Sequence, residues 1–266
     1  ELAAGITYAA ARQQAVQARL GDGAAVLRQP NDTLAVEYLK ACKQLKIELM
    51  PIAIRRIGAG HHGGAAEGYA SASHIRQLLE QGREGEALSY MPSSAAAVLR
   101  RELAAGRVTD SRHVERAILA QLRQMTEEEF AAYDGGGEGL YHRVYDAVRR
   151  CATVEELLAA VKTKRYTAAR LRRMVLAAWL GLPKAPETVP YARVLAANET
   201  GRAVLRQMRK NGAPVLTKAA DVAALGSGAE ALFRREARYT DLYTLAYADL
   251  AQAVPGSDWR LTPVMK

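Results

Sequence analysis

The sequence predicts a mostly helical protein with a small α/β portion at its start. Alanine is abundant among the 266 residues, and alanine is the best helix former. Apolar residues recur at helical spacing through most of the chain after residue 92. Before residue 60, helical segments alternate with short apolar runs, which is the pattern of an α/β sheet.

The first sixty residues are expected to run helix, strand, helix, strand. Thr7–Leu20 has the apolar spacing of a helix. The short apolar run Ala24–Leu27 is predicted to be a strand, and a helix capped by Asn31 or Asp32 is expected to follow it. Ile47–Ile57 is rich in isoleucine, leucine and methionine, which predicts a buried strand.

Helices dominate the remainder of the chain. After a glycine-rich loop at residues 58–68, a helix is predicted over His74–Gln81. The further predicted helices are Ser93–Ala105, Ser111–Gln124, Glu127–Tyr133, Glu138–Ala152, Val154–Val161, Thr167–Leu180, Thr200–Lys210 and Gly228–Ala251. The α/β pattern stops between residues 84 and 92, so we expect one domain over residues 1–88 and a second over residues 89–266.

Composition excludes several classes of protein. Hydrophobic content of 49% and charged content of 24% are those of a globular protein, not of a disordered one. No apolar run approaches the roughly 18 residues of a membrane span, and no membrane partner is expected. The two cysteines, Cys42 and Cys151, are too few for a disulfide framework or a four-cysteine zinc site, which favours a cytoplasmic protein.

Charge is the most informative property. The net charge of +9 and the pI of about 9.6 are typical of proteins that bind nucleic acid or an anionic membrane. Seven basic residues and no acidic residue fall in Leu157–Pro186, namely Lys162, Lys164, Arg165, Arg170, Arg172, Arg173 and Lys184. Such a cluster suits a sugar–phosphate backbone, and Tyr166 offers a ring for stacking on a base. The alternatives are a solvated helix face and a basic membrane helix.

The start of the helix near residue 72 predicts an anion site. Ser71 and Ser73 place two hydroxyls there, and Arg76 lies one turn further on. Free backbone N–H groups and the helix dipole favour phosphate at such a terminus, and arginine adds a bidentate donor. The alternative is a plain serine cap beside a solvated arginine.

A second set of polar residues follows the two predicted strands. Asn31 comes after the first strand, and Arg55 and Arg56 end the second. Ligands of open α/β sheets bind at this edge, so we expect these residues to face a ligand. Consecutive strand residues point to opposite faces, so only one of the two arginines reaches it, and the sequence leaves open which one.

The glycine-rich loop carries no specific chemistry by spacing alone. Gly58–Gly63 fits G-x-G-x-x-G, but the loop continues to Gly68 instead of opening a helix, so a flexible active-site loop is favoured over a dinucleotide site. His61 and His62 lack the further ligands of a metal site, and none is expected. No catalytic triad or other catalytic residue is identifiable.

Several of these segments occur in the same order in one known family. The chain resembles the bacterial tRNA(Met) cytidine acetate ligases, members of the HIGH-type nucleotidyltransferase superfamily. The matching segments are Tyr8–Arg12, Pro30–Leu34, Glu37–Ala41, Ile54–His62, Ala70–Arg76, Glu138–Leu140 with Arg143, Val161–Thr167 and Tyr191–Leu195. The most specific of them is Val161–Thr167.

The resemblance implies an ATP-dependent, AMP-forming ligase. Such enzymes activate acetate as acetyl-adenylate and transfer the acetyl group to the wobble cytidine of elongator tRNA(Met), giving N4-acetylcytidine. The implied fold is the C-terminal part of a Rossmann-like nucleotidyltransferase domain over residues 1–88, followed by a helical tRNA-binding domain over residues 89–266.

The resemblance also implies roles for individual residues. By motif, Asn31 and Arg56 contact ATP, with Arg55 as the second choice. The triphosphate, accompanied by Mg²⁺, is implied at Ser71, Ser73 and Arg76. The basic segment is implied to hold tRNA, through Lys162, Lys164, Arg165, Tyr166, Arg170, Arg172 and Arg173.

The sequence departs from the family in its first part. The paired-histidine motif of the HIGH type is absent, and the sequence begins with Glu1, so we expect a fragment that does not form the adenylate alone. His61-His62 stands where the family has an aromatic residue before histidine. Two other functions stay open: a non-catalytic RNA-binding helical module, and a nucleotidyltransferase for a small cofactor precursor, which needs no basic segment.

Overall fold

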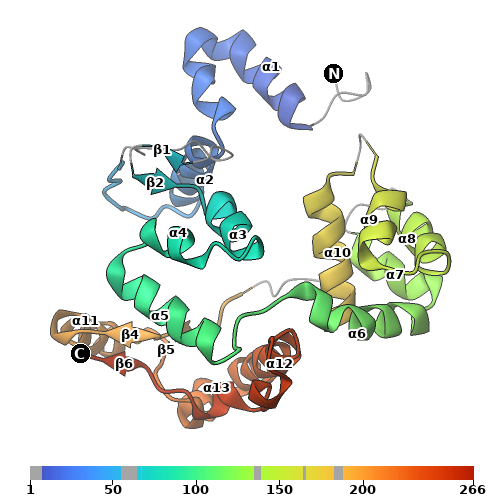
Figure 1. The fold of residues 1–266 in the computed structure, drawn as a ribbon. Coiled ribbons are helices and arrows are strands. Elements are labelled where there is room, and N and C mark those ends of the chain that lie inside the picture. Colours follow the sequence, from blue (N-terminus) through green and yellow to red (C-terminus); the bar gives the residue numbers. More distant parts are fainter. Residues whose placement is uncertain (1–7, 55–64, 67, 135–138, 164–165, 183–187) are drawn as a thin grey trace. The chain divides into compact units, whose positions relative to one another are not determined.

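The computed structural model describes residues 8–54, 65–66, 68–134, 139–163, 166–182 and 188–266. These residues are mostly helical, as the sequence predicts (Figure 1). They divide into two compact units, residues 1–99 and 100–266. The predicted change of pattern lies at 84–92, a few residues before the boundary of these units, and the functional division at residue 88 stays a prediction.

The first unit contains short helices and one small hairpin. Its elements are α1 (Tyr8–Leu20), the 3-10 helix η2 (Gly21–Arg28), α2 (Pro30–Gln44), β1 (Ala65–Ala66), β2 (Tyr69–Ala70), α3 (Ala72–Glu80), α4 (Glu84–Ser89) and the start of α5 (Ser93–Ala104). β1 and β2 pair antiparallel. Arg12 of α1 and Glu37 of α2 form an ion pair with a nitrogen–oxygen distance of 2.6 Å.

Both predicted strands of this unit are wrong within the described residues. Ala24–Leu27 lies inside η2, where the fully buried Ala24 carbonyl accepts a hydrogen bond from Gln13 Nε2 at 3.0 Å. Residues 47–54 form no strand, and every one of them is exposed. A strand needs a neighbour for its backbone N–H and C=O groups, and none of the described residues pairs with this segment. Residues 55–57 lie outside the described residues.

The predicted cap of α2 is also wrong. The helix begins at Pro30, whose fixed φ suits the first helical position, so Gln29 is the N-cap residue. Asn31 and Asp32 therefore lie within the first turn, and both are exposed.

A helical bundle opens the second unit. It comprises α6 (Ser111–Gln124), α7 (Glu127–Asp134), α8 (Leu140–Val148), α9 (Val154–Val161) and α10 (Ala168–Leu180), shown in green to yellow in Figure 1. Each helix contributes apolar residues to one core, in which Phe130, Leu140 and Val148 are fully buried. Local caps explain why α6 and α9 have the predicted bounds: Asp110 and Thr153 accept from the first-turn N–H groups of Arg112 and Glu156.

The C-terminal part of this unit contains strands that the sequence did not predict. Its elements are β3 (Ala192–Arg193), β4 (Ala196–Ala197), α11 (Glu199–Lys210), β5 (Val215–Leu216), the 3-10 helix η3 (Ala219–Leu225), α12 (Ser227–Thr244), the 3-10 helix η4 (Leu250–Gln252), α13 (Ser257–Arg260) and β6 (Val264–Met265). β3 pairs with β5 and β4 with β6, both in parallel. A second core forms around Phe233 of α12.

The last long helix is shorter than predicted. α12 ends at Thr244 instead of Ala251, because the next residues contact the segment before α6. Tyr247 forms a bridge with Thr109, and the Ala246 carbonyl accepts from the N–H of Asp110 at 2.8 Å. Among the residues with described positions, no helix is long and apolar enough to cross a membrane.

Candidate phosphate and nucleic-acid sites

The start of α3 has the geometry of the predicted anion site. Ser71 is the N-cap, almost fully buried, and its Oγ accepts from the N–H of His74 at 3.1 Å. Ser73 is exposed in the first turn and Arg76 is exposed one turn further on, with Arg76 Nη2 3.5 Å from Ser73 Oγ. Because the cap satisfies one N–H only, the other first-turn N–H groups stay available to an anion. Ser71 therefore shapes this helix end, and Ser73 with Arg76 forms its exposed polar face.

Of the other predicted nucleotide residues, the structure describes Asn31 but not Arg55 and Arg56. Asn31 is exposed at the start of α2, and among the described residues no hydrogen bond or ion pair joins it to Ser73 or Arg76. Arg55 and Arg56 lie outside the described residues, as does the pair His61-His62. The part of the chain that the structure describes contains no cluster of three or more residues suited to hold a metal ion.

The basic segment, residues 162–173, runs from the end of α9 into α10. Lys162 is the exposed C-cap of α9, and Thr167 is the N-cap of α10, accepting from the N–H of Arg170 at 3.3 Å. Arg172 and Arg173 project from α10 as exposed side chains without an ion pair among the described residues. Lys164, Arg165 and Lys184 lie outside those residues.

The predicted role of Tyr166 in base stacking is not supported by its position. Its side chain is only 5% exposed and belongs to the core of the helical bundle. The guanidinium carbon of Arg170 lies 5.3 Å from the centre of the ring and covers it further. The Tyr166 ring fills the junction between α9 and α10 and packs in the core beneath the basic residues, so its role is to hold these helices together.

The α10 helix presents two chemically different faces. Leu171, Met174, Val175 and Ala178 are buried in the bundle. Arg172 and Arg173 are exposed on the other side, and the half-buried Arg170 lies at the edge between the two faces, over the Tyr166 ring. Because the bundle fixes the helix, these charges are held on a rigid surface instead of a loop.

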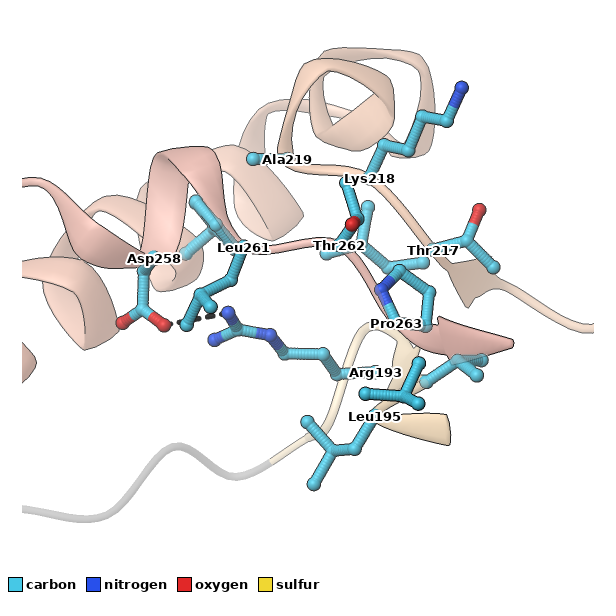
Figure 2. A pocket seen from close by; sticks show the side chains of 13 residues that line it. Arg193, Leu195, Thr217, Lys218, Ala219, Asp258, Leu261, Thr262 and Pro263 are labelled. Atoms are coloured by element: carbon cyan, nitrogen blue, oxygen red, sulfur yellow. Dashed lines mark hydrogen bonds and ion pairs between the residues drawn. The ribbon is translucent and has the colours of Figure 1, made fainter. Parts of the chain in front are cut away.

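A small pocket in the C-terminal part was not predicted from the sequence. Its volume is 180 Å³, and β3, β5, η3 and the segment from α13 to β6 line it (Figure 2). Arg193 lies in it and forms an ion pair with the buried Asp258 at 2.6 Å, while Thr240 donates to the other carboxylate oxygen at 2.5 Å. Both charges therefore have partners within the protein.

The segment Tyr191–Leu195 is thus held by long-range contacts. The Tyr191 hydroxyl donates to Glu236 of α12 at 2.6 Å. Burial raises the pKa of Tyr191 far above its usual range, and the hydrogen bond to Glu236 raises it further. The sequence signal for this segment was its match to the family, and the contacts identify a structural role for Tyr191 and Arg193.

Comparison with known proteins identifies the family. A family model described as HIGH Nucleotidyl Transferase matches residues 1–256. The chain belongs to this family. It is 31% identical over 274 residues to the tRNA(Met) cytidine acetate ligase of Thermoanaerobacter sp. (strain X514), covering 100% of this chain and 67% of that protein. It is 28% identical over 283 residues to the protein of the same name from Syntrophomonas wolfei, covering 99% of this chain and 68% of the relative.

Two solved structures of another protein have the same fold as this chain. Thermotoga maritima TmcAL without ligand superposes with a TM-score of 0.90 at 23% identity, over 99% of this chain and 68% of that chain. TmcAL bound with alpha-thio ATP superposes with a TM-score of 0.87 at 23% identity, over 99% of this chain and 67% of that chain. The resemblance inferred from the sequence motifs is therefore confirmed at the level of family and fold.

Proposed function

We propose that this chain acts in the ATP-dependent acetylation of a cytidine in tRNA(Met), as an acetate ligase. The observation that carries the proposal is the exposed basic surface of α10, in a chain whose full length matches relatives with that name. A basic surface fixed on a helix bundle suits a phosphate backbone, whereas a small-molecule nucleotidyltransferase has no need of it.

The reaction proceeds in two steps. A carboxylate oxygen of acetate attacks the α-phosphorus of ATP, and the bond to the bridging oxygen breaks to release pyrophosphate. The exocyclic amine of cytidine then attacks the carbonyl carbon of acetyl-adenylate. AMP leaves with the electrons of the carbon–oxygen bond, and the amine loses a proton. Charge develops on phosphate oxygens in the first step, so arginine and helix N-termini are the expected stabilisers.

The first unit is proposed to hold the nucleotide. Ser73, Arg76 and the first-turn N–H groups of α3 fit a phosphate group, because all are donors exposed at one helix end. Asn31, with Arg56 or Arg55, is assigned to ATP by motif. Mg²⁺ fits such a site without a protein cage, since it keeps several waters and binds phosphate oxygens directly; it would neutralise charge on the triphosphate.

The second unit is proposed to hold tRNA. Lys162, Arg172 and Arg173 are exposed cations beside Arg170. Lys164 and Arg165, which lie outside the described residues, are assigned to the same role by motif. Reading an anticodon base requires the base to leave its stack, while backbone contacts hold the surrounding RNA. The cations of α10 supply this second kind of contact.

The proposal is tested by tRNA binding at several salt concentrations. Replacing Arg172 and Arg173 by glutamate in one variant should reduce the slope of log affinity against log salt by roughly 1.4–1.8, about 0.7–0.9 per lost phosphate contact. The control variant carries Arg116→Glu and Lys43→Glu, two exposed cations outside the basic segment, and should keep the slope. An unchanged slope in the first variant contradicts the assignment of α10 to tRNA.

Pyrophosphate exchange tests the catalytic part. We expect the 266 residues alone to give no exchange between ATP and pyrophosphate in the presence of acetate, because they lack the paired-histidine motif that the resemblance assigns to ATP. Exchange by this chain alone would contradict that expectation. Binding of tRNA that is indifferent to ATP would favour a non-catalytic RNA-binding module instead.

A further inference from the structure

Helix α11 carries a second basic surface that the sequence analysis did not single out. Arg202, Arg206, Arg209 and Lys210 are all exposed. At 3.6 residues per turn they fall within an arc of about 100° on one side of the helix. Over these positions the helix contains no acidic residue, and its single acid, Glu199, lies in the first turn. The four cations therefore form one stripe, which we call the α11 stripe.

The α11 stripe is not explained by the stability of the helix. Arg209 and Lys210 lie in the last turn, where cations are favourable to the helix dipole. Arg202 lies near the opposite end and Arg206 lies mid-helix, so the dipole favours neither. The pairs Arg202–Arg206 and Arg206–Lys210 also have the i,i+4 spacing at which like charges repel. An external anion would relieve this repulsion.

The partners within the protein leave the stripe largely unneutralised. Arg202 donates to the backbone carbonyl of Lys266 at 3.3 Å, and Arg209 donates to Thr217 Oγ1 at 3.0 Å. Neither partner is a carboxylate side chain. Within the described part of the chain, Arg206 and Lys210 form no ion pair. Four positive charges are thus held close together, and no acidic side chain of the described residues forms an ion pair with them.

The packing of α11 argues against a membrane as the partner. A helix that lies in a membrane surface must insert its apolar side between lipids. Leu205 and Met208 on the apolar side of α11 are half-buried, and the helix packs on β4 and β5. Val204 on the same side is 54% exposed, so this side is partly covered by the protein and offers little apolar surface for insertion between lipids. The stripe therefore acts mainly through its charges.

We infer that the α11 stripe is a second contact for the sugar–phosphate backbone of tRNA, separate from the basic segment of α10. The inference rests on the proposed function, which supplies RNA as the substrate. Arg202 and Lys210 are eight residues apart, so the stripe extends over roughly 12 Å of helix axis. It adds salt-dependent affinity and holds the RNA in position without selecting its sequence.

The test uses the whole 266-residue chain and measures tRNA affinity from low to moderate salt. A variant with Arg206→Glu and Lys210→Glu is expected to reduce the salt slope by roughly 1.4–1.8. The control with Arg116→Glu and Lys43→Glu carries the same charge change on α6 and α2 and should keep the slope. Arg206→Glu alone should leave the midpoint of thermal unfolding unchanged or raise it, because it replaces two like-charge pairs by opposite-charge pairs.

The outcomes separate this inference from the proposed function. If the α10 variant loses slope and the α11 variant does not, the α11 contact is overturned and the proposed function stands. If the unmodified chain shows no salt-dependent affinity for tRNA, both are overturned. Vesicles of phosphatidylglycerol and phosphatidylcholine serve as a second probe. Tighter binding to these vesicles than to tRNA, lost in the α11 variant, would overturn the inference in favour of a membrane.

Discussion

The two units differ in what covers their apolar side chains. In the second unit, Phe130, Leu140 and Phe233 are almost completely buried in two cores. In the first unit, Met50, Ile52 and Ile54 are 82–91% exposed. Both sets of residues belong to apolar stretches of the sequence. An apolar stretch therefore indicates that a segment is suited to burial, but the neighbouring elements decide whether it is buried. The second unit contains those neighbours within its own residues.

The largest effect expected from this difference concerns stability. Phe130→Ala should lower the free energy of unfolding by about 3–5 kcal/mol, because it leaves a cavity in the bundle. Ile54→Ser should change it by no more than about 0.5 kcal/mol, because the side chain is already in solvent. Urea denaturation of both variants measures the two values. A cost for Ile54→Ser that approaches the cost for Phe130→Ala would break the comparison.

A smaller effect separates the two proposed ligands. Arg76→Ala should weaken the binding of ATP by roughly 10- to 100-fold, since a hydrogen bond to a charged group is worth roughly 1.5–3 kcal/mol and 1.4 kcal/mol is about a factor of ten. The tRNA salt slope should stay unchanged, because the cations of α10 lie in the other unit. Titration with a fluorescent ATP analogue measures the affinity. Arg83→Ala is the matched control, since Arg83 already pairs with Glu86 at 2.6 Å, and equal losses in both variants would contradict a specific site at Arg76.

The smallest effect is a pH dependence that only one of two helix starts should show. α6 is capped by the ionised Asp110, and hydrogen bonds from the side chain and backbone of Arg112 lower the pKa of Asp110 to about 2. α3 is capped by the neutral Ser71. Because the pKa of Asp110 is lower in the folded state, its contribution is present above the unfolded value of about 3.9 and is lost as the pH falls toward 2.

Hydrogen exchange from pH 5 to pH 2 measures this difference. Protection of the first turn of α6 should fall by the equivalent of about 0.5 kcal/mol or less, since the carboxylate is partly exposed and screened. The start of α3 should show no such loss. Asp110→Asn keeps a capping side chain and removes the titration, so it should flatten the profile. A pH dependence retained in that variant would assign the effect to another group.

Much of the helical fold could be predicted because its signals are local. The bounds of α6 and α9 are set by caps that act within one turn, Asp110 and Thr153. The strands could not be predicted in the same way. β3 and β5 are two residues each and are separated by a whole helix, so no periodic pattern marks them. The predicted strand at Ile47–Ile57 failed for the opposite reason, since its apolar pattern is clear but its described residues have no pairing partner.

The candidate site divides along the same line. The charge of the basic segment and the anion-binding pattern of Ser71, Ser73 and Arg76 were visible in the sequence, because they depend on residue type and short spacing. The position of Tyr166 was not, since its burial depends on how α9 and α10 pack. The α11 stripe has a clear helical spacing but lacks the long acid-free run that drew attention to α10.

The sequence by itself determined the helices, the net charge of +9 and the family, because each of these depends on residues close together or on ordered motifs. Only the tertiary structure decided which side chains are buried and which charges are balanced. Tyr191 meets Glu236 and Arg193 meets Asp258 across 45 and 65 residues of chain. Such pairs form when packing brings distant segments together, and the same packing leaves Arg172, Arg173 and Arg206 facing solvent, where they can meet an anion.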